Sequence, residues 1–429
     1  MYELKFEAME LKAGTSKNKL AYRGYNQAGR KETKAPGIIL GNLAALFRRV
    51  RKILNSREEY RIAFLVVLTL ATTVVFYYPF LVKAEYIGLP FFKLEKNTFD
   101  VMYRHWDGPV YVVVAKTLYS IKESPLPHLQ PEFYAAALVG YPLAIRLFSG
   151  MGYLNAMLFA SILFAVLAVL IFYKILKKFN YTKQPFFLAA LFTIFPPRWL
   201  INHSVGASEP MFIFFSLLAF YFYKKNDHPL AAVSAAVAAI TRVVGGLLFP
   251  FFLVMMFFDK NSSKKWWVYL IIPLALVAHF AYYQIAYGDF LIYFKLNSVG
   301  IASTPFSVVY SSAARTPAPE FFIGLFGITA LGIARAYRKD RALAFFALLL
   351  ALPAVFLNLS DISRYVLPAM PFALLIGFED ILTSKEFKYV LPFLVLLTYL
   401  YAWTFTGAAL DHLVPDDQWI PFARIVSTW

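Results

Sequence analysis

The sequence contains no cysteine and few charged residues. The lack of cysteine among its 429 residues excludes disulfide bonds, thiolate metal sites and a cysteine nucleophile, although it does not identify the cellular compartment. Charged residues make up 16% of the chain and hydrophobic residues 60%, whereas a soluble domain has about 25% and 45–50%. With a mean hydropathy of +0.58, this composition indicates a protein of the lipid bilayer. Apolar runs that recur with short gaps favour one continuous membrane body.

Several functional motifs are also missing. The six histidines are scattered, and neither an HExxH pattern nor an EF-hand loop is present, so we expect no metal site. The chain has no GxxxxGK[ST] loop to hold a nucleotide phosphate, which argues against an ATP-driven machine. The isoelectric point is about 9.6, but no basic face or base-stacking module accompanies it. We therefore expect no nucleic-acid partner.

Residues 1–60 differ from the rest of the chain. They are polar and basic, with stretches such as "AGTSKNKLAYRGYNQAGRKETKAPG", and they predict a flexible tail. Within the tail, Leu43 to Leu54 ("LAALFRRVRKIL") predicts a short basic amphipathic helix that lies on an anionic membrane surface. No short apolar segment with a small-residue cleavage site opens the chain, so we expect the first long apolar run to be the insertion signal.

Apolar runs after the tail predict an all-α polytopic membrane protein with about eleven transmembrane helices. Several of the runs are shorter than the roughly 20 residues that a straight span needs. The predicted spans are 61–82, 152–173, 185–201, 209–223, 229–241, 243–258, 265–287, 320–337, 341–357, 365–382 and 388–408.

The distribution of lysine and arginine predicts the orientation. Loops rich in these residues prefer the cytoplasm, and a cytoplasmic amino terminus places the whole formal net charge of +17 on that side. The unusual polar residues then gather on the opposite, extracytoplasmic face, which includes the long loop 83–151 and a short tail, 409–429. We expect the plasma membrane of a prokaryote, with the endoplasmic reticulum as the alternative.

The stretch "RHWDGPVY", from Arg104 to Tyr111, opens the first outer loop with an unusual group of polar and aromatic residues. Asp107 precedes Gly108-Pro109, so it could cap a helix, because proline suits the first helical position. A capping carboxylate is also held in place by neighbouring amides, and the structural and functional interpretations are compatible. Trp106 could equally be a residue of the interfacial aromatic belt.

Three further charged residues lie at span ends on the same face. Glu209 could be a first-turn acid stabilised by the helix dipole or a second acid in a shared chamber with Asp107. Arg242 interrupts a very apolar run, where a buried cation usually faces a cavity, a partner or an anion. Arg364, followed by Tyr365, could pair with Asp361 or hold a phosphate in bidentate fashion.

The order and common sidedness of several motifs resemble the PIG-V-type mannosyltransferases, members of the GT-C superfamily of multi-spanning glycosyltransferases that use polyprenyl-phosphate sugars. The motifs are Trp106-Asp107 with Tyr111, Phe195-Pro196-Pro197 with Ser208-Glu209-Pro210, "TRVVG" (Thr241 to Gly245), "GDFL" (Gly288 to Leu291) and "RYVLPAMP" (Arg364 to Pro371). The resemblance implies a GT-C-like catalytic bundle over residues 61–408. It is compatible with interfacial helices at 109–121 and 133–148 in the first outer loop.

The resemblance also implies a reaction. An inverting enzyme would move a sugar, expected to be mannose, from a polyprenyl- or dolichyl-phosphate donor to a hydroxyl of a lipid-linked glycan, glycolipid or protein on the extracytoplasmic face. No cofactor is implied. Asp107 would be the base, and Arg242, Arg364 or both would neutralise the phosphate, with Tyr365 beside them. Trp106 could stack on a sugar face, His105 and Glu209 could bind hydroxyls, and Arg104 is a further anion-binding candidate.

Two other classes of function remain open at this stage. A lipid or solute transporter, or a flippase, would fit the short spans, the Gly and Pro interruptions and the intramembrane arginine. Against it, no internal repeat is evident, and the polar residues cluster at one face where a midplane site would be expected. A noncatalytic member of a glycosylation complex would keep the outline of the family and lose its chemistry.

Overall fold

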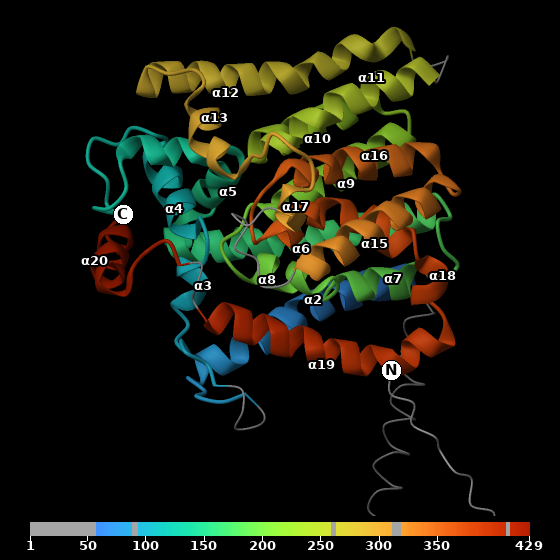
Figure 1. Ribbon diagram of the computed structural model, residues 1–429, viewed down its shortest axis with the longest axis horizontal. Coiled ribbons are helices and arrows are strands. Elements are labelled where there is room, and N and C mark those ends of the chain that lie inside the picture. The colour runs from blue at the N-terminus through green and yellow to red at the C-terminus, as the bar shows by residue number, and fades with distance from the viewer. Residues whose placement is uncertain (1–56, 88–92, 259–262, 311–318, 409–411) are drawn as a thin grey trace, which may run out of the picture. The chain divides into compact units, whose positions relative to one another are not determined.

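The structure is a computed structural model that describes residues 57–87, 93–258, 263–310, 319–408 and 412–429. The predicted amphipathic helix Leu43 to Leu54 lies outside the described residues, as does nearly all of the tail 1–60. Within the described part all regular elements are helical, and β-type pairing occurs only as isolated bridges (Figure 1). The prediction of an all-α fold is confirmed for this part of the chain.

Five helical segments are long and apolar enough to cross a membrane. They are α2 (Glu58–Leu81), α6 (Tyr153–Lys178), the segment Lys265–Tyr287 formed by η4 (Ser263–Leu270) and α12 (Ile271–Tyr287), α15 (Pro319–Tyr337) and α19 (Lys385–Gly407). Each coincides with a predicted span, and α2 begins three residues earlier than expected.

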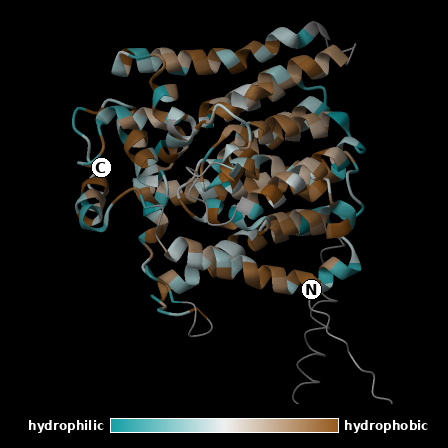
Figure 2. Ribbon diagram, viewed as in Figure 1, coloured by the Kyte–Doolittle hydropathy of each residue, from teal (hydrophilic) through white to brown (hydrophobic). Residues whose placement is uncertain are grey.

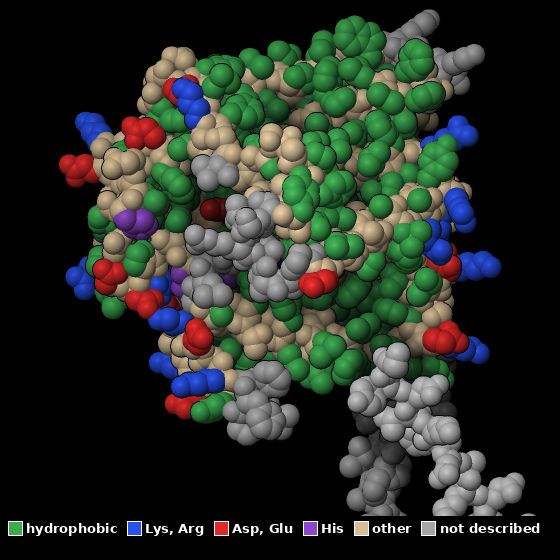
Figure 3. All heavy atoms as spheres, viewed as in Figure 1, with side chains coloured by type: hydrophobic (Ala, Val, Ile, Leu, Met, Phe, Trp, Pro, Cys, Tyr) green, Lys and Arg blue, Asp and Glu red, His purple; other side chains and the backbone are tan. Residues whose placement is uncertain are grey.

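The surface of the described part is apolar over a broad band. Figure 3 shows charged side chains at two opposite edges of the molecule, with hydrophobic side chains covering most of the face between them. Large apolar side chains such as Phe257, Ile285 and Tyr389 are each more than four-fifths exposed. Figure 2 shows that hydrophobic residues predominate along most of the helices, and many apolar side chains are buried between them. An exposed apolar surface this extensive is unfavourable in water, and it suits lipid.

The predicted span 185–201 is not one helix. It consists of two helices, α7 (Pro185–Phe192) and α8 (Pro197–Ser204). They are separate because Pro196 and Pro197 have no backbone N–H groups to donate the hydrogen bonds of a continuous helix. Helix α8 then meets α9 (Glu209–Lys224) at an angle of 112°. This bend places the start of α9, and with it Glu209, inside the protein.

The remaining short spans are also shorter or broken helices. They are α10 (His228–Thr241), η3 (Val243–Leu247), α11 (Leu248–Phe258), α16 (Arg341–Ala351), η7 (Leu352–Phe356), α17 (Ile362–Val366), η8 (Leu367–Ala369), the π-helical η9 (Pro371–Ile376) and α18 (Glu379–Leu382). The predicted turn between two short helices lies at Arg242, as expected. The prolines at 368 and 371 interrupt the segment 365–382, which was predicted to be continuous. The count of about eleven spans stays a prediction.

The first outer loop folds into short helices. They are α3 (Val101–Arg104), α4 (Gly108–Thr117), η1 (Pro131–Ala136), α5 (Gly140–Leu147) and η2 (Ser149–Met151). Helices α3, α4, α5 and η2 pack against α6, and η1 packs against α4. Helices are therefore present at both predicted positions, 109–121 and 133–148. Beyond α12 follow α13 (Ile292–Asn297), η5 (Ser298–Gly300) and α14 (Ser307–Tyr310), and α20 (Asp416–Ser427) ends the chain.

Candidate functional site

Asp107 lies at the start of α4 with its side chain directed into a cavity. It occupies the N-cap position, but its carboxylate makes no capping hydrogen bond. The backbone carbonyl of Asp107 accepts from the amide of Tyr111 at 3.0 Å, and Pro109 stands in the first turn. The carboxylate therefore does not cap the helix, although the sequence allowed that role. Its side chain is 48% exposed and lines a cavity of about 480 Å³.

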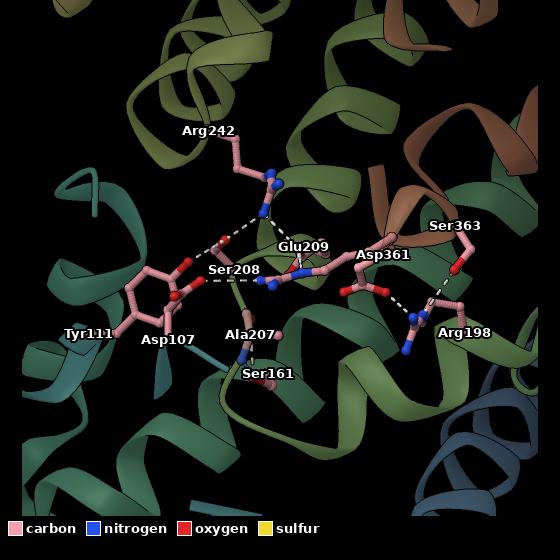
Figure 4. Close-up of polar contacts among 11 residues, drawn as sticks. Asp107, Tyr111, Ser161, Arg198, Ala207, Ser208, Glu209, Arg242, Asp361 and Ser363 are labelled. Carbon is pink, nitrogen blue, oxygen red and sulfur yellow. Dashed lines mark hydrogen bonds and ion pairs between the residues drawn. The ribbon is translucent and has the colours of Figure 1, made fainter. Parts of the chain in front are cut away.

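The buried carboxylate of Glu209 binds two arginines that line the cavity. One of its carboxylate oxygens, Oε1, accepts from Nη1 of Arg242 at 2.6 Å and also from Nε of Arg364 (Figure 4). Glu209 is completely buried, and it does not line the cavity. The Arg242 and Arg364 side chains are 15% and 7% exposed, and both line the cavity. Such burial is tolerable because each guanidinium has a carboxylate partner.

Ser208 and Tyr111 extend this network. Nη1 of Arg242 donates to Oγ of Ser208 at 3.2 Å, and that hydroxyl lies 3.1 Å from the Tyr111 hydroxyl (Figure 4). Burial raises the pKa of Tyr111 well above its ordinary value, and the nearby Asp107 carboxylate raises it further. Tyr111 therefore stays neutral at physiological pH and can donate a hydrogen bond.

The two arginines and the two carboxylates, Asp107 and Glu209, balance in formal charge. The two carboxylates differ in how accessible they are from the cavity. Glu209 is sealed from the cavity and serves as a fixed counter-ion. Asp107 is half exposed, and its Oδ2 lies 3.6 Å from Nη2 of Arg364, beyond hydrogen-bonding distance. An anionic group entering the cavity can therefore meet Arg242 and Arg364 without displacing a tight ion pair with Asp107.

The rest of the cavity wall is mainly apolar. The charged residues that line it, Asp107, Arg242 and Arg364, lie together at one end, since Arg364 is close to Asp107 and shares Glu209 with Arg242. The other walls come mainly from η1, α13, η5, η7 and the residues that follow them; they include Ala136, Leu138, Phe294, Leu296, Ile301, Pro353, Phe356 and Leu357. A cavity with one charged end and apolar walls suits a ligand that is itself amphiphilic.

Trp106 and Tyr365 lie against the arginines. The Arg364 guanidinium is 4.3 Å from the Trp106 ring centre, and the Arg242 guanidinium is 5.6 Å from that of Tyr365. Tyr365 lines the cavity, whereas Trp106 is buried behind it. Trp106 stacks on the Arg364 and Arg198 guanidinium groups and does not line the cavity, so its stacking on a sugar stays a prediction.

His105 and Arg104 face away from the cavity, toward the carboxyl-terminal segment. His105 is fully buried against Trp106 and forms an isolated β-bridge with His412. Burial lowers the pKa of His105 well below its ordinary value, so the ring is neutral. Arg104 donates to Asp416 at 2.6 Å and to the Val414 carbonyl at 2.7 Å. These two residues anchor the chain terminus beside the site and do not line the cavity.

Arg364 does not form the side-chain pair with Asp361 that the sequence allowed. Asp361 instead forms an ion pair with Arg198, a residue that the sequence gave no reason to select. The backbone amide of Arg364 donates to the Asp361 carbonyl at 2.9 Å, so the two residues share one turn while their side chains take different partners. Ser208 and Tyr111 belong to the "SEP" and "Trp-Asp…Tyr" motifs. Nothing in the sequence near either residue predicts that the two hydroxyl groups are in contact.

Among the described residues, no group of three or more histidine, aspartate or glutamate side chains is placed to hold a metal ion. Within this part of the chain the charged groups of the site pair with one another.

Comparisons with known proteins give little further resolution. No family model matches the sequence, and no curated protein matches it. Among solved structures, the chain is similar to the crystal structure of the Archaeoglobus fulgidus oligosaccharyltransferase tethered with an acceptor peptide containing the NVT sequon. The TM-score is 0.45 and the identity 14%, over 85% of this chain and 56% of that chain. The chain thus spans little more than half of that protein's length, and its function has to follow from its own residues.

Proposed function

We propose that this protein is an integral-membrane glycosyltransferase of GT-C type. It moves a sugar, with mannose as the first candidate, from a polyprenyl- or dolichyl-phosphate donor to a hydroxyl group of a lipid-linked glycan, glycolipid or protein. The observation that carries the proposal is the accessible Asp107 carboxylate, 3.6 Å from the Arg364 guanidinium, at the charged end of a cavity with apolar walls. A base and a phosphate-binding cation stand side by side, where an amphiphilic donor fits.

The reaction follows from these two groups. The acceptor oxygen attacks the anomeric carbon while its proton passes to Asp107. The bond from the anomeric carbon to the phosphate oxygen breaks, and its electron pair leaves with the polyprenyl phosphate. Attack opposite the phosphate inverts the anomeric centre. Arg242 and Arg364 stabilise the charge that gathers on the leaving phosphate, a contribution worth about 3 kcal/mol per group in related sites.

Glu209 has a separate role in this mechanism. Its Oε1 holds both guanidinium groups in place before the donor arrives, so they need no reorganisation when charge develops. Because it is sealed from the cavity, we assign it to holding the arginines, and the earlier hypothesis that it binds a sugar hydroxyl is not retained. In the proposed topology the site faces the extracytoplasmic side of a prokaryotic plasma membrane, and the amino terminus is cytoplasmic.

One observation favours a carrier as the second candidate. The 112° break between α8 and α9 puts a helix start, with Glu209 and two arginines, inside the protein, and transporters use broken helices in this way to bind anionic substrates. A carrier would move its lipid or anion without changing it, so chemical analysis of the products separates the two functions.

The experiment is sugar transfer by purified protein reconstituted with a lipid extract of its source, using a panel of radiolabelled polyprenyl-phosphate sugars. We expect wild type to transfer from one donor and Asp107→Asn to lose at least 99% of that activity, as general-base loss costs roughly 10²–10⁴-fold. The matched control is Asp417→Asn, which replaces an exposed acid in the first turn of α20 that belongs to none of the motifs and should leave transfer unchanged. Full activity in folded Asp107→Asn would reject the base. No transfer from any donor by folded wild type would reject the enzyme in favour of a carrier or a noncatalytic protein.

A further inference from the structure

Arg198 lies next to the site without lining its cavity. It comes from α8, and its side chain is only 8% exposed. One guanidinium nitrogen forms an ion pair with Asp361, and Nε donates to Oγ of Ser363 at 3.1 Å (Figure 4). These contacts cross from one part of the bundle to another, because α8 packs against α2, α6 and α19 whereas α17 packs against α16, η7 and η8.

Asp361 and Ser363 both belong to the short segment that carries Arg364. Asp361 immediately precedes α17, and Ser363 is the residue before Arg364. Helix α17 has five residues, far fewer than an isolated helix needs for stability in water. The direction in which it presents Arg364 therefore depends on contacts with the rest of the protein, and Arg198 supplies two of them.

Arg198 also contacts the segment that carries Asp107. Its guanidinium lies 5.5 Å from the ring centre of Trp106, the residue before Asp107, and 4.3 Å from that of Phe405 on α19. Trp106 has a φ of 46°, a left-handed conformation that is costly for a bulky side chain and needs support from its surroundings. Arg364 stacks on the same ring at 4.3 Å. One buried arginine thus touches both sides of the Asp107–Arg364 pair.

We propose that Arg198 is a positioning residue that sets the placement of the Arg364 guanidinium relative to residue 107. The importance of Arg198 for catalysis rests on the proposed function, whereas its effect on where the Arg364 guanidinium lies does not. Arg198 reaches neither substrate nor cavity, and it acts through Asp361, Ser363 and Trp106. Lysine cannot replace it fully, because a compact ammonium group lacks the planar fork that pairs with a carboxylate and a hydroxyl while lying on two aromatic rings.

The lack of cysteine in the chain allows a direct test that does not need activity. In the variant Asp107→Cys the single thiol stands at the accessible position facing Arg364, and its pKa can be read from the pH dependence of alkylation. A cation this close lowers a thiol pKa by about 1–3 units from its free value near 8.5. We expect Arg198→Met, added to Asp107→Cys, to bring the thiol pKa back toward 8.5 by about one unit and to slow alkylation roughly tenfold at any pH below the thiol pKa.

Controls separate positioning from general damage. Arg335→Met removes an arginine that also donates to an aspartate, Asp380, at 2.6 Å and lies 5.2 Å from an aromatic ring, Phe378, but has no contact with the site. It should leave the thiol pKa unchanged. Arg198→Lys should give an intermediate thiol pKa. If Arg198→Met does not fold, Asp361→Asn and Ser363→Ala remove its two partners one at a time, and each should raise the thiol pKa.

The outcomes are distinct. An unchanged thiol pKa in folded Arg198→Met, or in both partner variants, would overturn the positioning role. A thiol pKa that is also raised in Asp361→Asn or Ser363→Ala, which keep the Arg198 charge, supports it, even if wild-type protein transfers no sugar, in which case only the proposed function fails. If transfer is found, Arg198→Met should lower kcat about tenfold or more while KM for the donor changes less than twofold, because positioning acts mainly in the transition state.

Discussion

The carboxylate of Asp107 lies 3.6 Å from the guanidinium of Arg364, although the two residues come from opposite halves of the chain. This spacing brings a proton acceptor and an anion-binding group together without joining them in a tight ion pair. It is maintained by buried groups on several elements: Glu209 at the start of α9, Arg242 at the end of α10, and the contacts made by Arg198 on α8.

Replacement of Glu209 by glutamine should destabilise the protein and increase its response to anions. Breaking a buried ion pair costs about 3–5 kcal/mol, because the remaining charges, here those of Arg242 and Arg364, lose their partner. Added phosphate can partly replace the lost carboxylate, so it should raise the Tm of Glu209→Gln more than that of wild type. Thermal unfolding in detergent, with and without phosphate, measures both effects. Glu379→Gln, which breaks a more exposed pair with Lys339, is the control, and equal Tm values for wild type and Glu209→Gln would contradict the counter-ion role.

Gly108 should not tolerate a side chain. A Cβ there would lie 3.0 Å from the Tyr103 carbonyl oxygen and 3.3 Å from the sulfur of Met157, so the turn that presents Asp107 packs closely against α6. We expect Gly108→Ala to lower the free energy of unfolding by about 1–3 kcal/mol through overpacking. Gly150 has nothing within 4 Å of the same position, so Gly150→Ala should change stability by less than about 0.5 kcal/mol. Denaturant titration compares them, and a Gly108→Ala protein as stable as Gly150→Ala would show that the turn has room.

His412 should make stability depend on pH in the mildly acidic range. Burial, together with the Arg104 charge, lowers its pKa to about 4. The unfolded residue has a pKa near 6.5, so as pH falls from about 6.5 to about 4 the unfolded state takes up a proton that the folded state does not. Stability is therefore lost over that window and levels off below it. The Tm of His412→Asn should fall less steeply than that of wild type between pH 6.5 and 4, and parallel curves would exclude His412 as the source.

Asp416 should hold the carboxyl-terminal helix α20 to the first outer loop. Hydrogen bonds from Lys96 and Arg104 lower its pKa to about 2, so the contacts persist at neutral pH and are lost as pH falls from about 4 toward 2. Asp416→Asn should increase hydrogen exchange in α3 and α20 at pH 7. Asp289→Asn, in an exposed pair with Lys295, should leave exchange in both helices unchanged. Exchange in α3 and α20 that is the same in wild type and Asp416→Asn would show that other contacts hold the segment.

Much of the membrane body could be predicted from hydropathy, because a long apolar helix is a local property of its residues. The five long helical segments coincide with predicted spans. The break between α8 and α9 could not be placed in the same way. Pro196 and Pro197 indicate where a helix must stop, but the 112° turn that buries Glu209 depends on what packs around it.

The candidate site was predicted in part. Asp107, Glu209, Arg242 and Arg364 were selected as charged residues near span ends on one face, and Tyr365 as the neighbour of Arg364. The structure places all five around one cavity or directly beside it, and their roles stay predictions. The sequence did not indicate which partners these residues take. Asp361 and Arg364 are three residues apart, which suggested a local pair, yet each binds a residue of a distant helix.

Composition and short-range periodicity are enough to predict that this protein lies in lipid, that it is helical, and that a few charged residues must find partners. Helix packing was needed to show that one oxygen of Glu209 binds two arginines, that the Asp107 carboxylate does not cap a helix, and that Arg104 and His105 face the carboxyl-terminal segment. Those outcomes depend on distances between residues far apart in the chain, which are fixed when the helices pack and each buried charge takes the partner that packing brings within reach.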